Sequence, residues 1–487
     1  MNLCNINHNF NYELEKLCRI FLPFEKISLL TEVQPDDIYA VCTLTDNGKK
    51  AVAVLYIKEK VFTRELPCDP QDKAQELTLA TCLFECFCEA TEYKPCWGIL
   101  TGVRPVKLYH KLCDEFGEEK TKEYFKNTLL VDQSKIELCS DSMAPEYKII
   151  EHSRPDSFSL YISIPFCPTR CSYCSFVSHS VDKAKGLIGR YVELLCKEIA
   201  DTGKIARELG LFLQTVYIGG GTPVALTAVQ LEQIMKAVKD NFDLSGIEEY
   251  TVEAGRPDAI TEDKLLAIKN GGATRISINP QTMSDSVLRE IGRNHTAKQT
   301  EEAFALARKL GFDNINMDLI AGLPTDTYES FVDTVEKIIS MAPESVTVHS
   351  LSMKRASTLS VSGNLPEKSV GISASQMVDY ARKRLKDVGI LPYYLYRQSK
   401  TVGNLENVGY SKKGYEGLYN VYIMDETHTV LACGASGVTK LRESGSSRIE
   451  RIYNYKYPYE YIDRFEEILD RKSGIKTFYE SIKERRD

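Results

Sequence analysis

One stretch decides how this 487-residue chain is interpreted: Tyr161-Ile-Ser-Ile-Pro-Phe-Cys167-Pro-Thr-Arg-Cys171-Ser-Tyr-Cys174-Ser-Phe176. A short strand-like run ends directly before three cysteines in the spacing C-x3-C-x2-C. Thiolates are the usual ligands of iron–sulfur clusters, and a [4Fe–4S] cube normally takes four of them. Three cysteines leave one iron open, and an open position distinguishes a reactive metal site from a closed structural one. Cys167, Cys171 and Cys174 therefore predict a [4Fe–4S] cluster whose free iron is able to chelate S-adenosyl-L-methionine (SAM).

A zinc site and inert thiols are the alternatives for this triplet. Zinc prefers four ligands and usually takes its cysteines from separate C-x2–4-C pairs. The only nearby candidate for a fourth ligand is His179. The cluster is favoured once the motifs further along the chain are included.

A second group of cysteines has a different setting. Cys82, Cys86 and Cys88 lie in the segment Leu77–Cys88, which has the pattern of an apolar helix, and Cys96 follows this segment. Buried free cysteine behaves as a small hydrophobic residue. We expect these cysteines to pack in the core and not to bind a second cluster.

Composition and charge narrow the class of protein. The chain is 43% hydrophobic, and its 61 basic against 68 acidic residues give a net charge of −7, so general nucleic-acid binding is not expected. No run of 18 apolar residues is present, and Met1–Phe10 lacks the pattern of a signal peptide, so we expect a cytoplasmic protein without a membrane span. The 15 cysteines are an odd number, and their share lies far below the roughly 8–10% of disulfide-built chains.

From Phe158 onward, β-branched runs alternate with amphipathic stretches. We expect strands at Leu160–Pro165, Thr215–Ile218, Glu249–Glu253, Thr274–Ile278, Asn314–Ile320 and Ser345–Leu351, with helices near 187–203, 227–242, 262–270, 296–311 and 327–341. This alternation predicts a parallel α/β sheet, and six such units fit a partial or complete barrel. Functional residues of such barrels lie after the carboxyl ends of the strands.

The barrel is expected within residues 155–360, between an N-terminal α+β domain and a C-terminal region. Residues 1–150 contain candidate strands at Asp37–Thr45 and Lys50–Lys58 and a helix from Asp72 to about Glu92. For this domain three roles are open: a docking surface, a substrate lid and a purely structural module. Residues 361–487 are expected to be less regular.

The C-terminal region is rich in tyrosine, at Tyr393, Tyr394 and Tyr396 and again between Tyr453 and Tyr461. Alternation with a period of two predicts a strand or a packed aromatic surface. A base-stacking platform is the less favoured alternative because the local charge is not strongly basic.

Polar residues follow the expected strands. They are Gly219-Gly-Gly-Thr-Pro223, Glu253, Gln281, Arg293, Asp318 and Ser352. The glycines allow close approach of a ligand, the Glu253 carboxylate is suited to ribose hydroxyls, and Arg293 is suited to a carboxylate. Each residue alone is more often a cap, a turn or a satisfied core group, but candidates after successive strands indicate one functional edge.

The cysteine triplet together with Gly219–Pro223 resembles the radical SAM superfamily, over about residues 158–360. The later motifs are similar to those of the branch that contains oxygen-independent coproporphyrinogen III oxidases. Four strings resemble the HemZ-type coproporphyrinogen dehydrogenases: Trp97-Gly-Ile-Leu-Thr-Gly-Val-Arg-Pro105, Val252-Glu-Ala-Gly-Arg-Pro257, Pro392-Tyr-Tyr-Leu-Tyr-Arg-Gln398 and Val402-Gly-Asn-Leu-Glu-Asn-Val-Gly-Tyr410. The resemblance implies a partial (β/α)6 TIM-like radical SAM barrel that uses a [4Fe–4S] cluster and SAM.

The resemblance also implies roles for individual residues. Cys167, Cys171 and Cys174 would hold the cluster, Tyr161 would touch the SAM carboxylate region, and Tyr173 would contact adenine through its backbone. The methionine moiety would be held by Gly220, Gly221 and Thr222. The SAM pockets would be lined by Glu253, Gln281, Arg293, Asp318 and Ser352, and Val438 would be a late apolar contact.

The chain departs from the better-studied oxidases at two places. Those oxidases carry a fourth cysteine two residues after the triplet, where this chain has Ser175-Phe176. The motif at Glu253 is E-x-x-x-P, whereas relatives have the shorter E-x-x-P. The number of SAM molecules bound therefore stays open.

The implied activity is oxidative decarboxylation of coproporphyrinogen III to protoporphyrinogen IX in heme biosynthesis. Its partners would be a tetrapyrrole substrate, an electron donor and an electron acceptor. Arg256 and Arg104 are hypothetical ligands of the substrate carboxylates, but surface or structural roles are favoured for each of them.

Two other functions are consistent with the same fold. The first is a heme-binding chaperone, whose branch usually carries a His-Asn pair followed by Tyr-Trp. This chain has no histidine in Gly403–Tyr410, and its single tryptophan is Trp97. The second is another radical SAM reaction on a tetrapyrrole.

Overall fold

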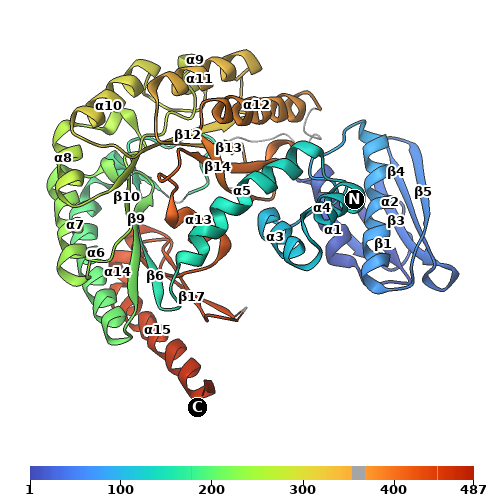
Figure 1. Cartoon of the computed structure of the whole chain (residues 1–487), viewed down its shortest axis with the longest axis horizontal. Helices are drawn as coiled ribbons and strands as arrows, with labels where there is room; N and C mark the ends of the chain where they lie inside the picture. The colour runs from blue at the N-terminus through green and yellow to red at the C-terminus, as the bar shows by residue number, and fades with distance from the viewer. Residues whose placement is uncertain (177, 354–367, 447, 487) are drawn as a thin grey trace.

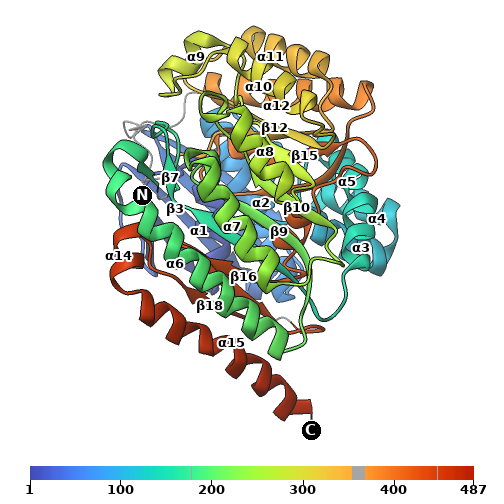
Figure 2. The same cartoon turned by 90° about the vertical axis from the view of Figure 1, so that its left-hand side faces the viewer.

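The computed structural model describes residues 1–176, 178–353, 368–446 and 448–486. Within these ranges the strands form a five-stranded sheet, an eleven-stranded sheet and a small two-stranded sheet. Figure 1 shows the N-terminal sheet beside the large sheet, with α3 and α5 between them, and Figure 2 shows helices covering the outer face of the large sheet.

The N-terminal sheet has the strand order β2-β1-β3-β4-β5. Its elements are β1 (Asn2–Ile6), α1 (Asn11–Phe21), β2 (Ser28–Leu30), β3 (Ile38–Thr45), β4 (Lys50–Ile57), β5 (Lys60–Pro67) and α2 (Asp72–Thr91). Alternate residues of β4 are buried, as expected of a strand that packs one face against helices. The two strands and the helix expected here are confirmed.

The cysteines of α2 belong to the N-terminal core. Cys82 and Cys86 are fully buried, and their thiols contact the backbone oxygens of Ala51 (3.7 Å) and Ala53 (3.6 Å) on β4. Burial raises the pKa of Cys82 to about 12 and that of Cys86 to about 11. These thiols are therefore protonated packing groups, as the sequence indicated.

A buried ionic group joins the N-terminal part to the large sheet. The connecting helices are α3 (Pro105–Phe116), α4 (Glu118–Glu123) and α5 (Gln133–His152). Glu406 accepts hydrogen bonds from Trp97 Nε1 at 2.7 Å and from Lys135 Nζ at 2.8 Å, and neither Glu406 nor Lys135 is more than 1% exposed. Two of the HemZ-like strings thus meet at one buried carboxylate.

The large sheet contains the six parallel strands that the sequence predicted. They are β6 (Ser157–Ile164), β9 (Phe212–Gly220), β10 (Glu249–Glu253), β11 (Arg275–Ser277), β12 (Ile315–Ala321) and β13 (Ser345–Ser350), adjacent in that order. The helices between them are α6 (Val181–Glu208), α7 (Ala228–Asn241), α8 (Glu262–Asn270), α9 (Asp285–Glu290), α10 (Ala297–Lys309) and α11 (Tyr328–Met341). Figure 1 shows α6 to α12 as an arc outside the strands, the arrangement of a partial barrel.

Local sequence fixes the ends of these helices. Thr227 and Thr296 each form a capping box with the glutamine three residues later, Gln230 and Gln299. The strands between the helices are buried on both faces, as parallel strands covered by helices are.

The C-terminal region is more regular than its sequence indicated. It contains α12 (Lys368–Asp387), β14 (Leu391–Arg397), β15 (Glu406–Ser411), α13 (Leu418–Asp425), β16 (Thr429–Cys433), β17 (Val438–Arg442), β18 (Ile449–Tyr453), α14 (Pro458–Asp463) and α15 (Phe465–Arg486). Strands β14 and β15 extend the sheet antiparallel beyond β13, and β16 pairs parallel with β6 on the other side. Within the described ranges, the strand pairing runs from β14 at one edge to β18 at the other, and these two edge strands are not paired with each other.

The two tyrosine-rich segments adopt different structures. Tyr393, Tyr394 and Tyr396 lie in β14, so the strand prediction is confirmed there. Between Tyr453 and Tyr461 the strand β18 ends at Tyr453, and Tyr457 caps the helix α14. The strand alternative is wrong for this second segment, because Pro458 begins the helix α14. The alternative of a packed aromatic surface is confirmed there, since the rings of Tyr457 and Tyr459 stack with centroids 5.4 Å apart.

In the part of the chain that the structure describes, no helix combines the length and apolar character needed to cross a lipid bilayer.

Candidate functional site

The candidate residues lie at one edge of the large sheet. The carboxyl ends of β6, β9, β11 and β13 lead into the cysteine loop, the glycine motif Gly219–Pro223, Gln281 and Ser352, respectively. Glu253 is the last residue of β10, whereas Asp318 lies within β12. The parallel strand β16 leads into the loop that ends at Val438. The sequence-predicted residues therefore share the functional edge of the sheet.

The cysteine loop begins where β7 (Phe166–Cys167) pairs with β8 (His179–Ser180). Cys167, Cys171 and Cys174 are free thiols, and the backbone N–H of Cys174 closes a turn on Cys171 O at 3.2 Å. Among the described residues, no three His, Cys, Asp or Glu side chains converge on one point as the ligands of a single ion do. The ligands of a cube need not converge, because each thiolate binds its own iron.

The triple glycine packs against the strand that leads into Cys167. Gly221 N–H donates to Ile164 O at 2.7 Å, and Thr222 N–H donates to Phe166 O at 2.8 Å. A Cβ atom on Gly221 would lie 2.6 Å from Phe166 O and 3.0 Å from Cys167 Sγ, and Gly220 has a φ of +108°. Glycine is required here because two backbones touch beside the first cysteine.

Glu253 is held in the interior by Tyr217. The Tyr217 hydroxyl donates to Glu253 Oε1 at 2.5 Å, and burial raises the pKa of Glu253 to about 7 although this hydrogen bond acts to lower it. The Tyr217 ring stacks on Tyr419 of α13 with centroids 4.4 Å apart, and Tyr161 lies 6.3 Å from both rings. Three aromatic rings therefore line the interior beside this carboxyl group.

Asp318 is the second interior carboxylate. Asn316 Nδ2 donates to Asp318 Oδ1 at 2.6 Å, and His349 Nε2 lies 3.8 Å from Asp318 Oδ2. Burial alone would raise the pKa of Asp318, but His349, Asn316 and Thr347 outweigh it, so that the pKa lies below its ordinary value. One interior carboxylate is thus ionised near neutral pH while Glu253 is partly protonated.

Gln281 and Ser352 each place an unpaired oxygen at the same edge. Gln281 adopts a φ of +69° and forms an isolated bridge with Leu319, and Ser352 forms one with Thr401. Among the described residues, the buried atoms Gln281 Oε1 and Ser352 Oγ have no hydrogen-bond partner. Buried polar atoms are normally satisfied, so these two atoms indicate a place for a polar ligand.

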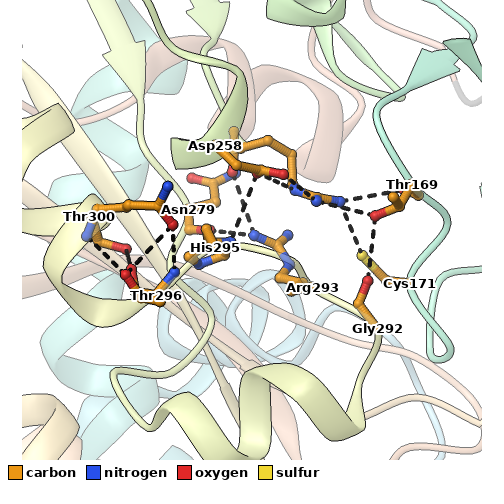
Figure 3. Close-up of polar contacts among 12 residues, drawn as sticks. Thr169, Cys171, Asp258, Asn279, Gly292, Arg293, His295, Thr296 and Thr300 are labelled. Atoms are coloured by element: carbon orange, nitrogen blue, oxygen red, sulfur yellow. Dashed lines mark hydrogen bonds and ion pairs between the residues drawn. The ribbon is translucent and has the colours of Figure 1, made fainter.

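Arg293 connects the cysteine loop to the strand ends. Its Nε donates to the Tyr173 hydroxyl at 3.2 Å, and one of its Nη atoms donates to Asn279 O at 2.6 Å. Figure 3 shows Arg293 beside Asn279 and Cys171. A buried guanidinium next to the cluster loop is suited to an anionic group of a ligand.

Val438 opens β17 opposite Tyr453. The preceding loop passes close to β6, since a Cβ atom on Gly434 would lie 2.5 Å from Ser163 O. Val438 thus begins the strand that follows this loop at the carboxyl end of β16.

The two hypothetical substrate ligands are already engaged. Arg256 is 3% exposed and forms a bidentate ion pair with Asp258 (2.9 and 2.8 Å), and Arg104 pairs with Glu426 at 2.7 Å. These contacts support the structural alternative for both arginines.

Sequence reasoning missed Tyr217, Tyr419, His349 and Asn316. Tyr217 and Tyr161 are paired across neighbouring strands, so the alternation within the two strands carried a signal for Tyr217. Tyr419 could not be found in this way, because α13 reaches the interior from a distant part of the chain.

The residues present fit a three-cysteine cluster with bound SAM. The three cysteines supply free thiols on one loop, and Gln281 and Ser352 supply buried oxygens without a partner among the described residues. Arg293 supplies a buried guanidinium next to the cysteine loop. The model of the radical SAM superfamily matches residues 161–338, a segment that runs from β6 into α11. Fold and site thus define a radical SAM protein, a class that uses a [4Fe–4S] cluster and SAM.

Comparison with curated proteins narrows the class. The chain is 39% identical over 380 residues to the oxygen-independent coproporphyrinogen-III oxidase-like protein HemZ of Bacillus subtilis, covering 77% of this chain and 76% of that protein. The chain belongs to this HemZ family of radical SAM proteins.

More distant relatives carry other names. The heme chaperone HemW of Lactococcus lactis is 37% identical over 193 residues, which are 40% of this chain and 48% of HemW. The oxygen-independent coproporphyrinogen III oxidase of Bradyrhizobium diazoefficiens is 28% identical over 291 residues, 58% of this chain and 63% of that protein.

Among solved structures, coproporphyrinogen III oxidase (HemN) from Escherichia coli, described as a radical SAM enzyme, has the same fold. The TM-score is 0.51 at 21% identity, over 66% of this chain and 71% of that chain.

Proposed function

We propose that this protein catalyses the oxygen-independent oxidative decarboxylation of coproporphyrinogen III to protoporphyrinogen IX, a step of heme biosynthesis. The similarity to HemZ carries the proposal, because its 380 matched residues extend well beyond the 161–338 segment shared by the superfamily. HemW relatives match over fewer residues or at lower identity: 193 residues at 37% in Lactococcus lactis and 313 residues at 26% in Haemophilus influenzae.

The reaction converts two propionate side chains into vinyl groups. When bound, the cluster and SAM supply the 5′-deoxyadenosyl radical that removes one hydrogen atom from a propionate β-carbon. Each propionate then loses CO₂ and one electron, which passes to an external one-electron acceptor. The protein itself has to bind the cofactors, orient the substrate carbon and exclude water.

The proposed cofactor contacts follow the geometry of the edge. Cys167, Cys171 and Cys174 would hold the cluster. The SAM molecule would be bound by Tyr161, Tyr173, Gly220, Gly221, Thr222, Glu253, Gln281, Arg293, Asp318, Ser352 and Val438. The unpaired oxygens of Gln281 and Ser352 support this set most directly.

Helix α13 would close the interior below the reacting groups. Leu418 and Tyr419 N–H groups at its start donate to Glu249, the first residue of β10, so the helix covers the amino end of the strands. The stacked rings of Tyr419, Tyr217 and Tyr161 then form an apolar floor that supports the exclusion of water.

The second candidate function is a heme chaperone, favoured by the HemW matches. Heme iron is commonly held by histidine. The only histidine after His349 is His428, which is 1% exposed and contacts Ser159 and Ser153 at 2.9 Å through its two ring nitrogens. This engaged histidine supports the enzyme over the chaperone.

The test is an anaerobic reaction of the reconstituted full-length protein with SAM, a reductant, an electron acceptor and coproporphyrinogen III. We expect substrate-dependent 5′-deoxyadenosine together with mono- and divinyl products, resolved by chromatography. SAM cleavage without any change in the porphyrins would contradict this substrate. Stoichiometric heme binding with neither product would favour the chaperone.

A further inference from the structure

The segment after β10 reaches across to the cluster loop. Arg256, in the HemZ-like string Val252–Pro257, donates from its two Nη atoms to Thr169 O at 3.3 Å and to Thr169 Oγ1 at 3.1 Å. The first of these Nη atoms also lies 3.9 Å from Cys171 Sγ. One buried guanidinium therefore contacts both the backbone and a cysteine of the loop.

The far side of the guanidinium is fixed by Asp258. Asp258 accepts from Nε and Nη2 of Arg256, and His295, fully buried, lies 3.9 Å from Asp258 Oδ1. A bidentate arginine–carboxylate pair is rigid as well as strong. The ion pair is oriented with its positive end toward Cys171 and its negative end away from it.

A second segment holds the same loop from the other side. Thr169 Oγ1 donates to Gly292 O at 3.3 Å, and Ser172 N–H donates to Ile291 O at 3.0 Å. Figure 3 shows Gly292 below Cys171, with Thr169 above it. Arg256 supplies the positive charge on the Asp258 side of the loop, whereas the Gly292 side contributes backbone oxygens and the neighbouring guanidinium of Arg293, which donates to Tyr173.

We propose that Arg256 is a positioning residue for the cluster, with two separable effects. Its fork of N–H groups orders the Thr169–Cys171 loop before the cluster is inserted. Its positive charge beside Cys171 stabilises the additional electron of the reduced cluster and thereby raises the midpoint potential, because net charge and hydrogen bonds to sulfur set that potential. The inference rests on the cofactor of the family and not on the proposed substrate.

Charge variants test the second effect by anaerobic redox titration, followed by electron paramagnetic resonance without SAM or porphyrin. Arg256→Met is expected to shift the midpoint potential to more negative values, and Asp258→Asn to less negative values. The midpoint potential of the double variant is expected to lie between those of the two single variants. Arg190→Met, which removes an exposed ion pair on α6, is the matched control and leaves the potential unchanged.

Loop order is tested on the cluster-free protein. Lysine keeps the charge but not the fork. Arg256→Lys is therefore expected to keep the potential within the range of the control, while alkylation of Cys171 becomes about tenfold faster, the factor for about 1.4 kcal/mol of lost hydrogen bonding. The alkylation of Cys171 is followed over time by peptide mass spectrometry, and the alkylation of Cys196 on α6 serves as the internal reference.

Thr169→Val provides a variant that keeps both charges if Asp258→Asn fails to fold. It removes the hydroxyl that contacts Arg256, so we expect faster alkylation of Cys171 at an unchanged potential. Potential shifts of the same sign for Arg256→Met and Asp258→Asn, or none, would overturn the electrostatic effect. An unchanged alkylation rate in both Arg256→Lys and Thr169→Val would overturn the positioning effect.

Discussion

The hydroxyl of Tyr217 on β9 donates a 2.5 Å hydrogen bond to Glu253 at the end of β10, yet burial still keeps the pKa of Glu253 near 7. In the unfolded chain the same carboxyl titrates near 4.5. The folded protein therefore retains a proton that the unfolded chain releases, so the free energy of unfolding falls as the pH rises from about 4.5 to about 7. For one group the loss amounts to about 3 kcal/mol.

Glu253→Gln removes this contribution. We expect the variant to gain stability relative to the wild type between pH 5 and pH 8, measured by urea unfolding of the cluster-free protein under reducing conditions. Tyr217→Phe removes the hydrogen bond that lowers the Glu253 pKa and should extend the pH-dependent range upward. Glu232→Gln, on the exposed face of α7, serves as the control, and equal pH profiles for Glu253→Gln and wild type would contradict the account.

The contact between Gly221 and Phe166 O predicts an effect of a single methyl group. Gly221→Ala places a Cβ atom 2.6 Å from that oxygen, and we expect a loss of about 1–3 kcal/mol of stability together with lower iron content after reconstitution. Gly186→Ala on α6 meets no atom within 4 Å and should instead stabilise by about 0.5–1 kcal/mol. Full iron loading of Gly221→Ala would count against the close approach.

The buried Lys135–Glu406 pair predicts a large effect far from the cysteines. Lys135→Met removes the positive charge that faces the buried Glu406 carboxylate and leaves Trp97 as its side-chain donor, and removing one partner of a buried pair costs about 3–5 kcal/mol. Lys386→Met, which breaks the exposed pair with Asp141, should cost less than about 1 kcal/mol. Equal denaturation midpoints for the two variants would contradict the structural role of the HemZ-like strings.

Arg293→Lys tests the proposed SAM contacts. Lysine cannot reproduce the simultaneous hydrogen bonds to Tyr173 and Asn279, so we expect SAM to bind about 10–100-fold more weakly to the cluster-loaded variant. Arg289→Lys on the exposed face of α9 is the matched control. Unchanged affinity at full cluster content, measured by equilibrium dialysis, would remove Arg293 from the SAM site.

The sequence predicted those parts of the fold whose signal is local. Glu249–Glu253 forms a strand with the bounds expected, and the other five barrel strands overlap their predicted ranges, because β-branched runs bounded by helical patterns are distinctive. The short helix α9 was missed, since its six residues give less than two turns of periodicity. The sequence also did not indicate how many strands the C-terminal region contains, because β15 pairs with β13 and β16 pairs with β6, which are distant in the sequence.

The site residues, too, could be predicted where the signal is local in the sequence and could not be predicted where it depends on contacts between distant segments. The cysteines and the triple glycine were visible because their spacing is contiguous, and Glu253 and Asp318 were visible from their places relative to strands. Arg256 was named as a hypothetical ligand of the substrate carboxylates, with a surface or structural role favoured over it. Its actual contacts with Asp258 and the cluster loop depend on how β10 and β6 are placed in three dimensions.

The most direct test of the proposed function follows a hydrogen atom. The reconstituted protein is incubated anaerobically with SAM, reductant, electron acceptor and coproporphyrinogen III deuterated at the propionate β-carbons, and the 5′-deoxyadenosine is analysed by mass spectrometry. The account predicts one deuterium in the 5′-deoxyadenosine, formed in step with the vinyl products. Unlabelled 5′-deoxyadenosine, or its formation at the same rate without the tetrapyrrole, would contradict it.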